Sequence, residues 1–308
     1  MRMTQPWIVF ALLLGVWSAR TAVAADAPKP GTMAEILARS KASDWRPLDP
    51  ENTIYLELPS GRIVIELAPQ FAPNHVTNVK ALAREHYFDG LAIIRAQDNY
   101  VVQWGDPNAE KPELARKIQT AKKTLPPEFD RAIDPKQSFV PLPDGDLYAP
   151  EAGLADGFPA ARDPKSGKTW LVHTYGMVGA GRDNTPDSGG GTEIYIVIGH
   201  APRHLDRNVT LFGRVVQGME QISILPRGPA PMGFYDKPEQ RVPIKSIRIA
   251  SDVPAAERTA LELLRTETPL FRELIEARRN RREDWFVNPV GHIEIGNVPL
   301  PARPVAKP

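Results

Sequence analysis

The alternation of apolar and polar positions predicts a β-hairpin followed by a helix near the start of the chain. Residues 53–58 (TIYLEL) and 62–67 (RIVIEL) alternate with a period of two and are rich in β-branched side chains, with Pro-Ser-Gly between them. Between residues 73 and 85 apolar side chains recur at helical spacing, and Pro73 suits the first turn of a helix. We therefore expect two paired strands and then one amphipathic helix.

Further segments with strand character lie at 91–95, 100–103, 192–198, 209–216 and 244–249. They are short, and the turns between them are rich in glycine and proline. Only one clear helix accompanies these strands. This combination favours a mostly β fold, with a closed sheet and helices that cap it.

Two regions depart from this β pattern before residue 173. Residues 26–50 are polar, apart from a short helix that we expect at 33–41. Residues 108–172 contain several proline- and glycine-rich turns and few periodic runs. We interpret them as a long, irregular loop insertion.

After residue 250 the pattern becomes helical, and we expect helices at 255–266 and 270–282 before an extended tail. The chain then divides into four parts: a targeting segment (1–24), an N-terminal arm (25–50), a β domain with its insertion (51–250), and a helical C-terminal extension with its tail (251–308).

The first 25 residues have the three parts of a secretory signal peptide. Arg2 precedes an apolar run at 7–17, and small residues at 22–25 place the expected cleavage after Ala24. Eleven apolar residues are too few to cross about 30 Å of hydrocarbon as a helix. An uncleaved anchor is the alternative interpretation. We expect export to a compartment such as a periplasm, without stable membrane insertion once the signal is removed.

Composition narrows the chemistry that is available to the chain. The 308 residues include no cysteine, which excludes disulfides, thiolate nucleophiles, iron–sulfur clusters and cysteine-bound zinc. The 38 basic and 37 acidic side chains give a net charge of +1, so we expect no general attraction to nucleic acid. His200 and His204 flank Pro202 in a loop, and no acidic third ligand has suitable spacing, so we expect no metal site.

Three segments, in matching order and spacing, resemble the cyclophilins, which are peptidyl-prolyl cis-trans isomerases. The first is 63–79, the second is 87–107 (YFDGLAIIRAQDNYVVQWGDP), and the third is 204–219, with HLDRN, LFGRV and GM. The resemblance covers about residues 51–250. It implies a closed eight-stranded antiparallel barrel capped by two helices, with a substrate groove on the outer face of the sheet.

The resemblance also implies an enzyme that rotates X–Pro peptide bonds in unfolded or folding polypeptides. Amide resonance gives this rotation a barrier of about 18–20 kcal/mol, and catalysis requires stabilisation of the twisted state. Neither a nucleophile nor a cofactor is needed. Arg95 aligns with the family's catalytic arginine, whose guanidinium is always protonated and presents several donors. Gln103, eight residues later, aligns with the glutamine that orients it.

Other positions are assigned to the substrate groove by the same resemblance. Tyr100 and Val101 align with one wall of the proline pocket, and Tyr195 and Leu205 align with the other. The remaining groove positions depart from the family pattern, and they are Gly181, Arg182, Glu193 and His204. Arg182, together with Asp183, occupies the element whose backbone binds the residue before proline. Glu193 stands in place of a frequent glutamine, and His204 stands in place of the tryptophan of cyclosporin-sensitive members, so we expect weak cyclosporin binding.

A second hypothesis is a binding or chaperone module that keeps the cyclophilin fold but has weak or no isomerase activity. The altered segment 181–193, the insertion at 108–172 and the extension at 251–308 all provide surface that such a module would use. An assay on an Ala-Pro peptide distinguishes the two hypotheses.

Overall fold

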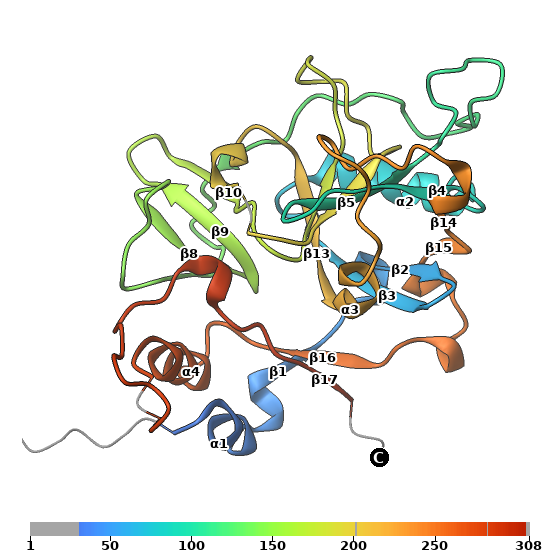
Figure 1. Cartoon of the computed structure of the whole chain (residues 1–308). Coiled ribbons are helices and arrows are strands. Elements are labelled where there is room, and N and C mark those ends of the chain that lie inside the picture. The colour runs from blue at the N-terminus through green and yellow to red at the C-terminus, as the bar shows by residue number, and fades with distance from the viewer. Residues whose placement is uncertain (1–30, 201, 282, 306–308) are drawn as a thin grey trace, which may run out of the picture.

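The main sheet of the protein is antiparallel and has nine strands (Figure 1). The computed structural model describes residues 31–200, 202–281 and 283–305, so the expected signal peptide at 1–24 lies outside the described residues. In chain order the strands are β2 (Thr53–Leu58), β3 (Gly61–Leu67), β4 (Ala92–Ala96), β5 (Val101–Gly105), β11 (Met177–Ala180), β12 (Ile194–Val197), β13 (Leu211–Gln217), β14 (Val242–Pro243) and β15 (Ser246–Ile249). Their order across the sheet is β14-β4-β5-β12-β11-β13-β3-β2-β15.

The sheet is curled but open, so the expectation of a closed eight-stranded barrel is wrong. Its two edge strands, β14 and β15, are consecutive parts of one extended segment and continue each other instead of pairing. The intervening Ile244 bonds back to Leu91 on the β4 side, whereas the N–H of Lys245 donates to Glu57 on β2. Pro243 also lacks an N–H to extend the ladder.

The predicted hairpin and first helix are confirmed. Strands β2 and β3 pair in continuous register from Thr53–Glu66 to Leu58–Gly61. Helix α2 (Pro73–Arg84) buries Val76, Val79 and Leu82 against the sheet. The helical pattern was strong because α2 has one buried face, whereas β2 and β3 are largely buried on both faces and were recognisable from their β-branched residues.

The insertion contains a sheet, which corrects the expectation of an irregular loop. Five antiparallel strands pack in the order β6-β10-β9-β8-β7. Their bounds are β6 (Arg131–Ala132), β7 (Phe139–Pro141), β8 (Glu151–Ala155), β9 (Phe158–Asp163) and β10 (Lys168–Leu171). The sequences EAGLA and FPAARD carry few β-branched residues, so strand propensity is low and tertiary burial decides the outcome. Gly153 permits this packing, because a Cβ there would lie 2.2 Å from the carbonyl oxygen of Val140.

The C-terminal extension is not helical as a whole. The helix expected at 255–266 is replaced by a 3-10 turn, η6 (Ala255–Glu257), and strand β16 (Leu261–Leu264). Strand β16 lies between β1 (Trp45–Pro47) and β17 (Ala302–Pro304). Helix α4 (Pro269–Arg279) occupies most of the second expected helix, and α1 (Met33–Ala38) lies within the helix expected in the arm.

The arm, the insertion and the extension share a second hydrophobic core, beside the main one. Helices α1 and α4 are in contact, and in Figure 1 they lie on the same side of the molecule as the insertion sheet. The core's larger buried side chains are Ile36, Trp45, Leu142, Leu154, Trp170, Leu264, Phe271, Leu274 and Ile295. Within the described residues, no helix is both long enough and apolar enough to cross a bilayer.

Candidate active site

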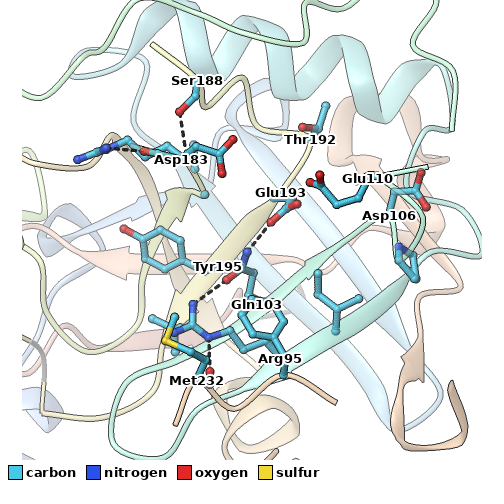
Figure 2. A pocket seen from close by; sticks show the side chains of 18 of the residues that line it. Arg95, Gln103, Asp106, Glu110, Asp183, Ser188, Thr192, Glu193, Tyr195 and Met232 are labelled. Carbon is cyan, nitrogen blue, oxygen red and sulfur yellow. Dashed lines mark hydrogen bonds between the residues drawn. The ribbon is translucent and has the colours of Figure 1, made fainter. Parts of the chain in front are cut away.

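A groove with a volume of about 1030 Å³ runs along the main sheet (Figure 2). Strands β4, β5 and β12, the segment after β11 and residues 232–241 provide its walls. Eight of the ten residues that the sequence placed at the site line this groove, namely Arg95, Tyr100, Val101, Gln103, Gly181, Arg182, Glu193 and Tyr195.

Three acceptors fix the position of the Arg95 guanidinium. Arg95 and Gln103 are direct partners across β4 and β5, and Nη1 of Arg95 donates to Oε1 of Gln103 at 3.0 Å. Its Nε donates to the carbonyl oxygen of Met232 at 2.6 Å, and Nη2 donates to the side-chain oxygen of Gln97. Only 8% of Arg95 is exposed, so the charge is held in one place and shielded from water.

Two aromatic rings also contact this guanidinium. Its central carbon lies 5.0 Å from the ring centroid of Phe234 and 5.4 Å from that of Tyr100. Burial lowers the pKa of Arg95 from its ordinary value, while Tyr100 and Glu193 oppose this shift. The guanidinium remains protonated, because an arginine pKa starts far above neutrality.

Gln103 connects Arg95 to a carboxylate. Its Nε2 donates to Oε2 of Glu193 at 2.5 Å, while its Oε1 accepts from Arg95, so the amide orientation is fixed at both ends. Burial raises the pKa of Glu193; the hydrogen bond from Gln103 opposes the shift, and the charges of Asp183 and Glu110 add to it.

Apolar and aromatic side chains line the groove beside Arg95. Val101 and Tyr195 are buried on the neighbouring strands β5 and β12. Tyr195 packs onto Gly179, where a Cβ would lie 2.4 Å from the tyrosine oxygen. Behind this wall His173 is fully buried, with its ring 5.8 Å from that of Tyr195 and 6.4 Å from that of Tyr100. Burial lowers the pKa of His173 to about 4.

The Arg182 guanidinium is held by the loop rather than directed at the groove. Its Nε donates to the carbonyl of Asn208 at 2.8 Å and its Nη1 to the carbonyl of Asp183 at 2.6 Å. The neighbouring Gly181 is close to both Gln103 and Glu193: a Cβ there would lie 3.4 Å from the Gln103 amide nitrogen. No group of three His, Asp or Glu side chains in the described part of the chain is arranged to hold a metal.

Two expected residues lie elsewhere, and several residues that line the groove were missed. His204 and Leu205 belong to the 3-10 turn η3 (Arg203–Leu205) and are not among the residues that line the groove. Val209, Met232 and Phe234 are among the lining residues that the sequence did not indicate. Met232 and Phe234 come from a glycine- and proline-rich segment, where no periodicity distinguishes a groove wall from an ordinary turn.

Comparison with known proteins agrees with this geometry. Residues 53–249 match the family model described as "Cyclophilin type peptidyl-prolyl cis-trans isomerase/CLD". A probable peptidyl-prolyl cis-trans isomerase of Brucella suis is 28% identical over 186 residues, which is 58% of this chain and 74% of that protein. Peptidyl-prolyl cis-trans isomerase-like 1 of Gibberella zeae is 25% identical over 199 residues, 65% of this chain and 95% of that one.

Among solved structures, cyclophilin AquaCyp293 from Hirschia baltica is similar in fold. It superposes with a TM-score of 0.67 at 23% identity, covering 89% of this chain and 97% of that one. The structural likeness therefore extends beyond residues 53–249. The chain belongs to the cyclophilin family, and its enzyme class is peptidyl-prolyl cis-trans isomerase (EC 5.2.1.8), which confirms the class expected from the sequence.

Proposed function

We propose that Arg95 catalyses X–Pro rotation by donating hydrogen bonds to the amide in its twisted state. The observation that carries this proposal is the fixed guanidinium. Of its five N–H donors, three are used by Met232, Gln103 and Gln97, which leaves one on each terminal nitrogen without a partner among the described residues. Two donors are therefore available to the substrate at a preset position.

The chemistry follows from the loss of resonance in the twisted amide. A planar X–Pro bond delocalises the proline nitrogen lone pair, whereas the twisted bond localises it and makes the nitrogen a better acceptor. A fixed donor near that nitrogen then favours the twisted state over both planar states. Tyr100, Val101 and Tyr195 surround the proline ring in this arrangement and exclude water, which strengthens the interaction with Arg95.

Replacement of Arg95 by alanine tests this mechanism. We expect Arg95→Ala to lower kcat/KM by about 100-fold, because one preset donor group is typically responsible for 10²–10³ in rate. A protease-coupled assay on an Ala-Pro peptide measures it. Arg272→Ala, an exposed arginine on α4, is the matched control and should retain full activity.

Equal activity of the wild type and Arg95→Ala would contradict the mechanism. Wild-type acceleration no greater than that of buffer would instead favour the binding or chaperone module, which keeps the fold without efficient catalysis. Circular dichroism of each variant shows whether a loss reflects unfolding.

We also propose that the substrates are exported polypeptides. The signal-like pattern at 1–24, with its apolar run and small residues before Ala25, supports this proposal. A fusion of residues 1–40 to a reporter enzyme that is active only outside the cytoplasm tests it. An inactive reporter, together with full-length fusion protein in the cytoplasm, would refute export.

A further inference from the structure

The groove continues past Gln103 to an end that carries carboxylates. Glu193, Glu110 and Asp183 line this part, and Figure 2 shows Glu193 and Glu110 close to each other at the end away from Met232. Asp106 also lines the groove, but its two oxygens accept backbone N–H groups of Asn108 and Arg116, at 2.9 and 2.6 Å. We call Glu193, Glu110 and Asp183 the acidic end.

No side chain of opposite charge forms an ion pair with the acidic end in the described part of the chain, although the charge of Arg95, on the other side of Gln103, opposes the rise in the pKa of Glu193. Neither Glu110 nor Asp183 forms an ion pair with a described residue, and the bond that Glu193 receives comes from the neutral amide of Gln103. The nearby Arg182 is occupied by loop carbonyls. Burial is the main cause of the raised pKa of Glu193, and the charges of Asp183 and Glu110 add to it, which is the effect expected of carboxylates that repel each other.

Two further cations line the groove, Lys123 and Arg241. Neither forms an ion pair with the acidic end among the described residues, and neither is among the charges that shift the pKa of Glu193. The carboxylates therefore face the open groove, and a ligand that brings a positive charge relieves their repulsion.

The position of the acidic end relative to the proline pocket indicates which substrate residue it contacts. Gly181 directly precedes Arg182, whose backbone is assigned to the residue before proline, and Gly181 is adjacent to Glu193, because a Cβ on Gly181 would lie 3.2 Å from the Cβ of Glu193. We propose that the acidic end selects a lysine or arginine side chain located one to three residues before the proline. This inference rests on the proposed function, and it names the substrate class of the same groove.

Matched peptides test the inference with the full-length protein. Lysine, norleucine and glutamate are placed in turn one, two and three residues before a Pro-Phe pair, and isomerisation is measured by NMR exchange. At one of these positions we expect kcat/KM for lysine to exceed that for norleucine by about 5-fold, with glutamate lowest, as for a partly shielded ion pair. The ratio should approach one in about 1 M salt, where the Debye length is about 3 Å.

Three variants test whether the acidic end causes the lysine preference, and a fourth is the control. Glu110→Gln and Asp183→Asn should each reduce the lysine preference, and the double variant, which keeps only Glu193, should reduce it further. Glu113→Gln removes the same charge from an exposed position outside the groove lining and should keep the preference. Equal rates for lysine and norleucine at all three positions, or a preference that is undiminished in the double variant, would overturn the inference.

Failure of the proposed function gives a different result. If the norleucine peptides rotate no faster than in buffer, the catalytic proposal fails, and the charge selection is then decided by binding of the same peptides in calorimetry. If norleucine peptides rotate fast and lysine confers no advantage, the catalytic proposal stands and only the inference fails.

Discussion

His173 is a buried titratable side chain behind the groove wall. It is fully buried beside Tyr100 and Tyr195, and neither ring nitrogen has a hydrogen-bond partner in the described residues. Burial lowers its pKa from 6.5 to about 4. The unfolded chain therefore binds a proton at a higher pH than the folded protein does, and folding stability falls as the pH drops through this range.

As the pH falls from about 6.5 to about 4, we expect the free energy of unfolding to decrease by on the order of 3 kcal/mol because of His173. His173→Phe removes the titrating group and should flatten this part of the stability profile, measured by urea unfolding at several pH values. His292→Gln, at an exposed position, should retain the wild-type slope. A wild-type slope in His173→Phe would contradict the assignment.

The pairing of Arg95 with Gln103 was predictable from sequence because their spacing is local. Arg95 and Gln103 lie on adjacent strands joined by a short turn, so eight residues of separation place them opposite each other. Met232 and Phe234 reach Arg95 from more than a hundred residues away, on a segment without periodicity. Such contacts depend on the tertiary fold, and no local pattern indicates them.

The same distinction holds for whole elements. Helix α2 buries one face, so its period was visible, and several strands of the main sheet were visible because they are rich in β-branched and aromatic residues, although most are buried on both faces. Strand β16 (LELL) consists of residues that favour helices, and it becomes a strand only because β1 and β17 provide backbone partners on both sides. The insertion sheet was also missed, because its strands have low strand propensity and burial, not local preference, stabilises them.

The turn η3 is joined to the insertion by one buried arginine. Arg203 is 7% exposed, and its guanidinium donates to Asp146 at 2.7 Å and to Asp206 at 2.9 Å. Asp206 in turn accepts the backbone N–H of His173 at 2.8 Å. These contacts link Asp146 in the insertion, through Arg203 and Asp206, to His173, which lies behind the groove wall.

Arg203→Met should lower the unfolding free energy by about 3–5 kcal/mol, because it leaves two buried carboxylates without their partner. Urea unfolding measures the loss. Arg207→Met, which breaks a more exposed pair with Asp130, serves as the control and should cost less than about 1 kcal/mol. A similar cost for both variants would show that the Arg203 pairs do not depend on burial.

At the scale of the whole molecule, the extension completes the second core instead of forming an independent tail. A chain that ends at residue 257 loses Leu264, Phe271 and Leu274, and exposes Trp45 and Trp170. We expect a melting temperature more than about 10 °C lower and binding of a hydrophobic dye, since each large core side chain is typically responsible for 2–5 kcal/mol.

A point variant tests the same core if the shortened chain does not fold. Leu274→Ala should cost about 2–5 kcal/mol. Trp285→Ser, at a tryptophan that is 82% exposed, should leave the melting temperature unchanged. An unchanged melting temperature in both Leu274→Ala and the shortened chain would show that the extension does not stabilise the protein.

The second core can be completed only after the strands of the main sheet have been synthesised. The last strand of the main sheet, β15, ends at Ile249, whereas β17 of the three-stranded sheet ends at Pro304. During synthesis the strands that carry Arg95 and Gln103 are therefore complete while Trp45, Leu142 and Trp170 still lack their C-terminal partners. Contacts between segments so distant in sequence form slowly. The nascent enzyme thus passes through a stage with a finished groove and an uncovered apolar face, and that stage is the most vulnerable to aggregation.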